Sequence, residues 1–203
     1  MGRPGFFLNK HLPNASNEEK LQRSMLAHAM MFFSRGVPVV YYGDEQGFTG
    51  DGNDVDARED MMPSKVASYN DNTLLGTEQT TKNDNFNPQH PLYKSIAEYA
   101  AIRKQQPLLQ YGVQENKFFD DKKQVFAFAR VANDTMPNGG VAQQNDEALL
   151  VVFNVSAEQQ TVTVSQQYES YLVVSGAAKI SASDNGETQI TLPAFSFGLF
   201  SSK

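Results

Sequence analysis

Residues 35–47 read Arg-Gly-Val-Pro-Val-Val-Tyr-Tyr-Gly-Asp-Glu-Gln-Gly, and this stretch decides the fold of the first half of the chain. The run from Val37 to Tyr42 is almost wholly apolar and rich in β-branched and aromatic residues. Such a run is typical of a strand that is buried on both faces of a parallel sheet. Pro38 is compatible with a strand because it lies near the start of the run. We therefore predict a strand over residues 37–42.

An amphipathic helix precedes this strand. Ser16 and Glu19 have the spacing of a capping box, in which the serine hydroxyl accepts from the N3 amide and the glutamate reaches back. Gly36 supplies a left-handed stop, so the helix is predicted over residues 17–35. Its apolar stripe comprises Leu21, Met25, Ala29 and Phe32, widened by Leu26, Met30 and Phe33. A helix followed by a buried strand is the second part of a βαβ unit. Since the first strand is missing, we expect that the chain begins inside a domain.

A long polar stretch, residues 43–90, follows the predicted strand. A loop of this length in a compact domain is usually functional. Pro91 then occupies a favourable first helical position, and the apolar spacing predicts a helix over residues 92–105 that Pro107 ends.

From about Leu108 the apolar period changes from that of a helix to two. Short strands separated by turn signals, without helices, favour an antiparallel sandwich over residues 108–203. The predicted strands are residues 125–131, 148–155, 160–164, 171–174, 188–192 and 195–200, with a further one at Ile180.

Residues 35–47 resemble the last barrel strand of the α-amylase family of glycoside hydrolases, in which Gly-x-Pro-x-x-Tyr-Tyr-Gly-x-Glu follows an amphipathic helix. This chain matches that pattern at Gly36, Pro38, Tyr41, Tyr42, Gly43 and Glu45. Residues 58–61 resemble the Arg-x-x-Met element of the loop after that strand, and residues 192–200 resemble the close of the family's C-terminal domain.

The resemblance implies an α+β fold class for this piece. Residues 1–107 would be the last helix–strand–helix of a (β/α)₈ barrel, with the seventh helix at 17–35, the eighth strand at 37–42 and the eighth helix at 92–105. Residues 108–203 would be an all-β antiparallel sandwich. The loop 43–90 would lie beside the sugar site of the intact enzyme.

The family cleaves α-glucosidic bonds with retention, using an aspartate nucleophile, a glutamate acid/base and a third aspartate within Asn-His-Asp-x-x-Arg. Met1-Gly2-Arg3 fits the end of that motif, so the resemblance implies that all three carboxylates lie upstream. We therefore expect an inactive C-terminal fragment of an enzyme that hydrolyses or transfers α-linked glucosides of starch-derived or related α-glucans and oligosaccharides. The alternative is a non-catalytic carbohydrate-binding or interaction module. The lack of tryptophan counts against sugar binding.

The resemblance suggests three substrate-side residues, Arg3, Asp56 and Arg58. In the family the counterpart of Arg3 sits behind the catalytic aspartates, where a cation helps to keep carboxylates ionised. Because Arg3 is close to the terminus of this chain, we expect it to be disordered here. The other reading of residues 51–60 is a solvated acidic loop in which Arg58 is paired internally. For Glu45, a structural role is favoured over that of a general acid.

Cofactors and partners are constrained by composition. We expect no cofactor. Calcium remains an alternative, but the loop fails the EF-hand pattern because Val55 holds an acidic position and Asp56 the required glycine. The three histidines share no zinc-ligand spacing. The net charge of −6 speaks against nucleic acid, and no apolar run is long enough for a membrane helix. The partner of the intact enzyme would be an α-glucan or oligosaccharide. The unpaired strand 37–42 could also produce a dimer or swapped assembly. Localisation stays open, with a secreted or periplasmic parent as one alternative.

Overall fold

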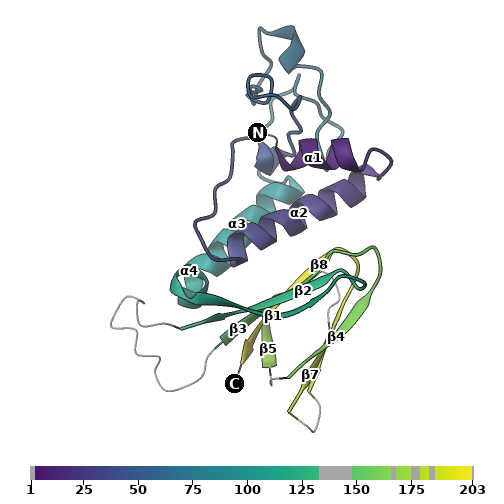
Figure 1. Ribbon diagram of the computed structural model, residues 1–203. Coiled ribbons are helices and arrows are strands. Elements are labelled where there is room, and N and C mark those ends of the chain that lie inside the picture. Colours follow the sequence, from purple (N-terminus) through teal and green to yellow (C-terminus); the bar gives the residue numbers. More distant parts are fainter. Residues whose placement is uncertain (1–2, 133–147, 166–167, 175–178, 183–185, 203) are drawn as a thin grey trace. The chain divides into compact units, whose positions relative to one another are not determined.

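The computed structural model describes residues 3–132, 148–165, 168–174, 179–182 and 186–202. The chain divides into two compact units, the first made of residues 1–31 and 38–100 and the second of residues 32–37 and 101–203. Helices α2 (Asn17–Phe33) and α3 (Pro91–Gln105) begin in the first unit and end in the second (Figure 1). None of the helices in the described ranges is both long and apolar enough to span a bilayer.

Two helices open the first unit. α1 (Pro4–His11), which the sequence pattern did not predict, starts with proline at a first-turn position. α2 begins where the capping box predicted, because Ser16 Oγ accepts a hydrogen bond from the Glu19 amide at 3.1 Å. The Glu19 carboxylate does not reach back to the N-cap. It accepts instead from Arg23 Nε, one turn further along the helix, at 2.9 Å.

The strand predicted over residues 37–42 is not formed in this chain. The segment belongs to no sheet, and Val37 and Val39 are 87% and 75% exposed. A parallel strand needs neighbours that pair with its edges and layers that cover its faces. The described part of the first unit offers no strand to pair with it. The apolar pattern thus marks residues suited to burial, but the partners that would bury them are absent from the described structure.

Residues 43–90 form the predicted long loop, with short 3₁₀ turns η1 (Asp44–Gln46) and η2 (Ala67–Tyr69) and one isolated bridge between Thr73 and Thr80. Its two ends are tied together by a reciprocal pair. The Gln46 side chain donates to the Asn87 carbonyl at 3.1 Å and accepts from the Asn87 amide at 3.0 Å.

The buried His90 closes the loop against α3. Its Nε2 lies 2.9 Å from the Leu75 carbonyl, and its Nδ1 accepts from the Leu92 amide at 3.2 Å. This pattern requires a neutral ring with the proton on Nε2. Burial lowers the pKa of His90, which agrees with the neutral form.

The C-terminal end of α2 lies in the second unit, where two buried arginines bind its last carbonyls. Arg103 donates to the carbonyls of Phe32 and Gly36 at 2.5 and 2.6 Å. Arg130 donates to Phe33 at 3.1 Å and to Gly112 at 2.7 Å. Burial, with a smaller effect from the charge of Arg103, lowers the pKa of Arg130 to about 10. Cations at a helix C-terminus interact favourably with the helix dipole. The helix ends at Phe33 rather than at the predicted residue 35.

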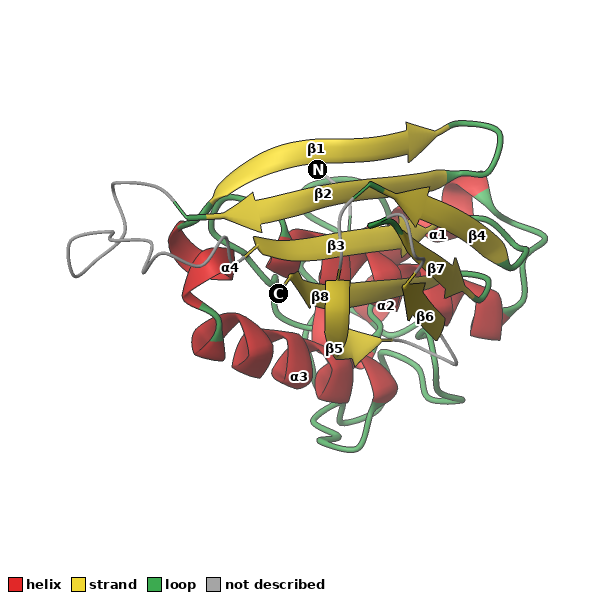
Figure 2. Cartoon of the chain, turned by 90° about the horizontal axis from the view of Figure 1, so that it is seen from below, coloured by secondary structure: helices red, strands yellow, loops and turns green. Residues whose placement is uncertain are grey.

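After α4 (Pro107–Tyr111) the second unit is an antiparallel sandwich, as predicted. One sheet has the order β1-β2-β3-β8-β5 (Figure 2). Its strands are β1 (Val113–Asp120), β2 (Val125–Val131), β3 (Ala148–Asn154), β8 (Ser196–Ser202) and β5 (Tyr168–Val174). The other sheet has the order β4-β7-β6, with β4 (Gln160–Val164), β7 (Thr188–Leu192) and β6 (Lys179–Ala182).

The predicted strands match β2, β4 and β7 in full, whereas β1 was not predicted. β1 is an edge strand whose residues are half-buried or exposed, so its apolar alternation is weak. The sheets enclose an apolar core made of Val125, Ala127, Leu150, Val152, Val162, Val164, Tyr168, Ile190, Leu192 and Phe200. Asn154 fixes one end of this core. Its side-chain amide donates to the carbonyls of Glu158 and Pro193 at 2.7 and 2.6 Å.

Candidate functional site

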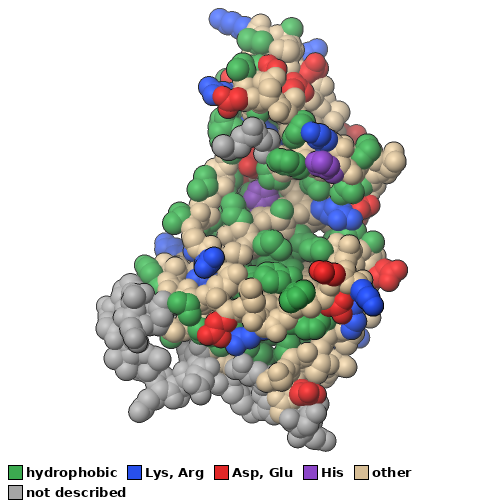
Figure 3. Space-filling view, viewed as in Figure 1, with side chains coloured by type: hydrophobic (Ala, Val, Ile, Leu, Met, Phe, Trp, Pro, Cys, Tyr) green, Lys and Arg blue, Asp and Glu red, His purple; other side chains and the backbone are tan. Residues whose placement is uncertain are grey.

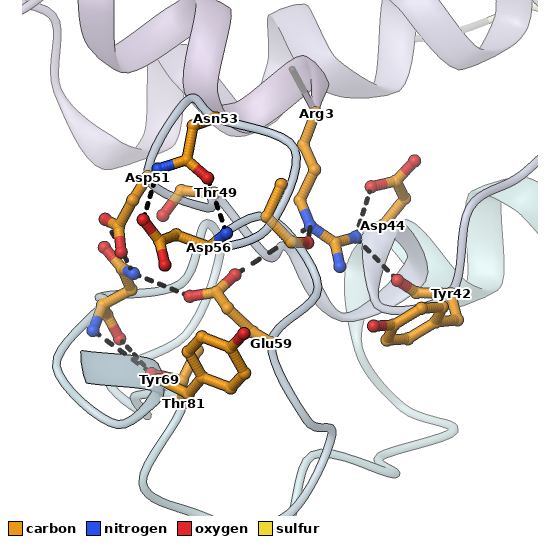
Figure 4. Close-up of polar contacts among 12 residues, drawn as sticks. Arg3, Tyr42, Asp44, Thr49, Asp51, Asn53, Asp56, Glu59, Tyr69 and Thr81 are labelled. Carbon is orange, nitrogen blue, oxygen red and sulfur yellow. Dashed lines mark hydrogen bonds and ion pairs between the residues drawn. The ribbon is translucent and has the colours of Figure 1, made fainter. Parts of the chain in front are cut away.

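Arg3 is the centre of the polar network in the first unit (Figure 4). It is 3% exposed. Nη1 donates to the Tyr42 carbonyl at 2.6 Å and to Asp44 Oδ1 at 3.0 Å, and Nε donates to the Ala57 carbonyl at 3.1 Å. The expectation that Arg3 is disordered is therefore wrong. The expectation considered only that Arg3 is near the end of the chain. The residues that hold Arg3 in place lie at least 39 positions further along.

Aromatic rings surround the same guanidinium. Its carbon lies 4.7 Å from the ring centroid of Tyr41, 5.3 Å from Tyr42 and 5.4 Å from Phe48. Contacts of this kind contribute roughly 0.5–2 kcal/mol each, more where water is excluded. The two tyrosines of the Tyr-Tyr-Gly motif thus shield Arg3 on their inner side while remaining 41% exposed themselves.

Two buried carboxylates flank Arg3. Asp44 forms a direct ion pair, and Glu59, which is fully buried, places Oε2 3.9 Å from Nε. Glu59 Oε1 accepts from the side-chain amide of Asn72 at 2.7 Å. Burial raises the pKa of both carboxyl groups, and the charge of Arg3 opposes that rise in each case. The positive charge of Arg3 therefore compensates the negative charges of both Asp44 and Glu59 in a buried site.

Two atoms of this cluster have no hydrogen-bond partner, Arg3 Nη2 and Glu59 Oε2. Both are buried, and a buried donor or acceptor without a partner costs about 1–3 kcal/mol. The other atoms of Arg3 bind the carbonyls of Tyr42 and Ala57 and the carboxylate of Asp44, so the cluster fixes the backbone around it. Its carboxylates face Arg3 rather than solvent, so neither is placed to act as a nucleophile.

The loop at residues 51–60 is held by its own side chains. Asn53 accepts from the amides of Val55 and Asp56 at 2.8 Å, and its side-chain amide donates to the Asp56 carboxylate. Arg58 pairs with Asp54 at 2.7 Å while both remain exposed. This internal pairing of Arg58 was expected in the alternative reading of the loop, and substrate contact by Asp56 and Arg58 stays a prediction. Figure 3 shows side chains of both charges over these loops.

The remaining motif residues shape the backbone. Gly36 and Gly43 have φ values of +106° and +87°, a region that disfavours side chains with a Cβ. At Gly43 a Cβ would also lie 2.9 Å from the ring of Phe48. Pro38 precedes the tyrosine pair, and Glu45 lies half-buried in η1 near His90. Burial and a side-chain hydrogen bond to Tyr41 raise the pKa of Tyr42 to about 12.

No group of three or more His, Asp or Glu side chains in the described ranges is arranged to hold a metal ion. His28 is engaged through Nδ1 with the Ser24 carbonyl at 2.8 Å, and His90 is engaged on both nitrogens.

Sequence reasoning named Arg3 but missed its carboxylate partners Asp44 and Glu59, and also Asn72, which donates to Glu59. Asp44 stands at a variable position of the Tyr-Tyr-Gly-x-Glu motif, and Glu59 lies in the element of residues 58–61. Both residues were therefore part of the segments considered in the sequence. The only signal for them was that a buried arginine needs carboxylates. That signal appears only once the burial of Arg3 is known.

Comparison with known proteins gives a consistent result. The family model described as "Alpha-amylase SusG C-terminal domain" matches residues 141–196. An α-amylase of Streptomyces lividans is 43% identical over 145 residues, which is 71% of this chain and 16% of the relative. The chain thus spans less than a fifth of that relative's length.

Solved structures share the fold. The crystal structure of α-amylase from H. orenii covers 100% of this chain, which in turn covers 38% of that protein, with 20% identity and a TM-score of 0.64. A structure of an AmyP variant in complex with maltotriose covers 98% of this chain, and 38% of that protein is covered, with 20% identity and a TM-score of 0.63.

Proposed function

This chain belongs to the α-amylase family of glycoside hydrolases, and from that premise we propose that it is the C-terminal part of an enzyme that cleaves α-glucosidic bonds with retention. In this proposal the first unit is the end of the catalytic barrel and the second is the C-terminal sandwich. The substrates would be starch-derived or related α-glucans and oligosaccharides. Hydrolysis and transfer to another sugar use the same covalent intermediate, and both fit the proposal.

One observation carries this proposal. Arg3, the last residue of one family-like motif, donates to the Tyr42 carbonyl and to Asp44 within another motif 39 to 41 positions along the chain. Two resemblances recognised separately in the sequence therefore meet at one buried ion pair. Such a meeting is expected if both segments belong to the same barrel site.

Arg3 is best understood as a positioning residue. It is buried beneath the tyrosines, and it donates three hydrogen bonds, to Tyr42, Asp44 and Ala57. Asp56 and Arg58 remain the proposed substrate contacts because they lie in the long loop and Arg58 is exposed. A hydrogen bond to a charged group contributes roughly 1.5–3 kcal/mol, enough to select one sugar geometry over another.

The test uses the protein extended upstream through the barrel, with maltoheptaose as substrate. We expect sugar release with the α configuration retained, as followed by NMR. Asp56→Ala and Arg58→Ala should each raise KM about tenfold or more, since each removes a charged hydrogen-bonding group. Asp121→Ala, in the exposed turn between β1 and β2, is the matched control and should leave KM unchanged. Absence of release from every α-glucan tried would contradict the proposed function, and unchanged KM values would remove both residues from the site.

The alternative is a non-catalytic binding or interaction module. The lack of tryptophan counts against the carbohydrate-binding form of this alternative.

A further inference from the structure

The start of α1 lies directly against the loop at residues 48–58. A Cβ added to the buried Gly5 would lie only 2.7 Å from the Phe48 carbonyl oxygen. A Cβ added to Gly52 would overlap the ring of Phe6. Glycine permits such a close approach because it has no side chain to separate the two segments. The helix and the loop therefore meet in van der Waals contact at two places.

Residues 51–58 of this loop have two ties to the start of α1, one polar and one apolar. The polar tie is the hydrogen bond from Arg3 Nε to the Ala57 carbonyl at 3.1 Å. The apolar tie is the contact between the ring of Phe6 and Gly52. Asp56 lies between these ties along the chain (Figure 4). Its position relative to α1 therefore depends on both of them.

Other hydrogen bonds of this segment come from within the long loop. The Tyr69 hydroxyl donates to the Val55 carbonyl at 3.2 Å, and the Asn72 side chain donates to Asp51 at 3.1 Å. Both donors lie at or after η2, a single 3₁₀ turn in a loop with little regular structure. The ties at α1 differ because they connect the segment to a helix.

The ring of Phe6 is itself held by its own helix. Lys10 Nζ, one turn further along α1, lies 5.8 Å from the ring centroid, and the ring of Phe7 meets it edge to face at 5.8 Å. Phe6 is half-buried, whereas Phe7 is 52% exposed. A ring held in this way presents a fixed apolar surface to the loop.

We propose that Phe6 is a positioning residue that holds residues 51–58 in place for substrate binding. This inference rests on the proposed function, in which Asp56 and Arg58 contact the α-glucan. Phe6 acts through these two residues and does not itself touch the sugar. Loss of its ring should weaken substrate binding and leave the chemical step intact, since contacts made equally in the ground state and the transition state change KM alone.

The first test is hydrogen exchange in the 203-residue chain. The amides of Asp56 and Arg58 donate within the loop, to Asn53 Oδ1 and the Val55 carbonyl, so their exchange reports local opening of the loop. Phe6→Ala should speed this exchange about tenfold, because one tie to α1 is lost. Phe7→Ala is the matched control. It makes the same change at the next, more exposed position and should leave the exchange unaltered.

The second test uses the protein extended upstream through the barrel, with maltoheptaose as substrate. Phe6→Ala should raise KM about fivefold while kcat changes by less than about twofold. Phe6→Leu should bring KM back toward its original value, because leucine still provides apolar surface against Gly52. Phe7→Ala should leave both constants unchanged. In a protein that already carries Asp56→Ala and Arg58→Ala, Phe6→Ala should raise KM by less than about twofold, since the residues through which Phe6 acts are gone.

The inference is overturned if Phe6→Ala exchanges like Phe7→Ala, if its KM is unchanged, or if its full effect persists without Asp56 and Arg58. A fall in kcat equal to the fall in kcat/KM would also overturn it, since the chemical step would then depend on Phe6. An unaltered extended protein that releases no sugar would contradict the proposed function instead. The exchange measurement in the 203-residue chain would then still decide whether Phe6 holds the loop.

Discussion

The contacts of Arg3 show how one residue can organise a long loop. Its guanidinium has a planar fork of donors, and two segments of the chain supply the acceptors, one at Tyr42 and Asp44 and the other at Ala57. A lysine could not reach all three, since it offers a single charged nitrogen. The loop from residue 43 to residue 90 has little regular structure, so its shape depends on such point contacts more than on backbone ladders.

Replacing Arg3 by methionine should destabilise the first unit by about 3–5 kcal/mol at neutral pH, because Asp44 and Glu59 would remain buried without their cation. The loss should shrink as the pH falls toward about 5. Burial already raises the pKa of both carboxyls, so the folded state takes up protons at a higher pH than the unfolded state does. Protonation then removes the uncompensated charge.

Urea unfolding at the two pH values measures this effect. Arg58→Met is the control, since it breaks an ion pair that is exposed on both sides and should change the free energy of unfolding by no more than about 0.5 kcal/mol. A loss at Arg3 that does not vary with pH would mean that packing, rather than charge compensation, explains its burial.

At the scale of the elements, residues 37–42 illustrate what a pattern can and cannot predict. The helix at residues 17–33 and the strands β2, β4 and β7 were predicted because their signals are local: a capping serine, a stripe at helical spacing, or strict alternation. The apolar run 37–42 has an equally clear signal, yet it forms no strand. Its pairing depends on neighbouring strands that the described structure does not contain.

Some features gave no local signal at all. The edge strand β1 carries too few alternating apolar residues, and the partners of Arg3 lie 41 and 56 positions away. The same holds for Arg103 and Arg130, whose charges are compensated by helix carbonyls rather than by carboxylates that a sequence search would seek. Polar contacts between residues far apart in the sequence could not be predicted from this sequence.

Hydrogen exchange can test the interpretation of residues 37–42. In this chain no described residue accepts a hydrogen bond from the amides of Val37, Val39 or Val40, so we expect exchange close to that of an unfolded peptide. In the upstream-extended protein the same amides should be protected about 100-fold or more, as members of a buried strand. The amides of β2 and β3 serve as the internal control and should be protected in both proteins.

Strong protection of residues 37–42 in a dilute sample of this chain would contradict that interpretation. Protection that increases with protein concentration would instead show pairing between copies through this segment, which is the swapped or dimeric assembly that an unpaired strand invites.

At the scale of the whole molecule, the described ranges combine a polar site whose buried carboxylates face a cation with a sandwich that has its own core. In the described ranges, the buried carboxylate of Asp44 pairs with Arg3, and that of Glu59 lies beside Arg3 and accepts a hydrogen bond from Asn72. Retaining cleavage requires two carboxyl groups about 5–5.5 Å apart on either side of the scissile bond. Under the proposed function, bond cleavage belongs to residues outside this chain, and residues within it support the site.

The most direct test compares glucose release from maltooligosaccharides by the 203-residue chain and by the version extended upstream through the barrel. We predict release by the extended protein alone, with no activity above background in this chain at equal molar concentration. Equal activity in both would contradict it. That result would place a complete catalytic site within these residues, with Glu45 and the loop at residues 51–60 as the first groups to replace.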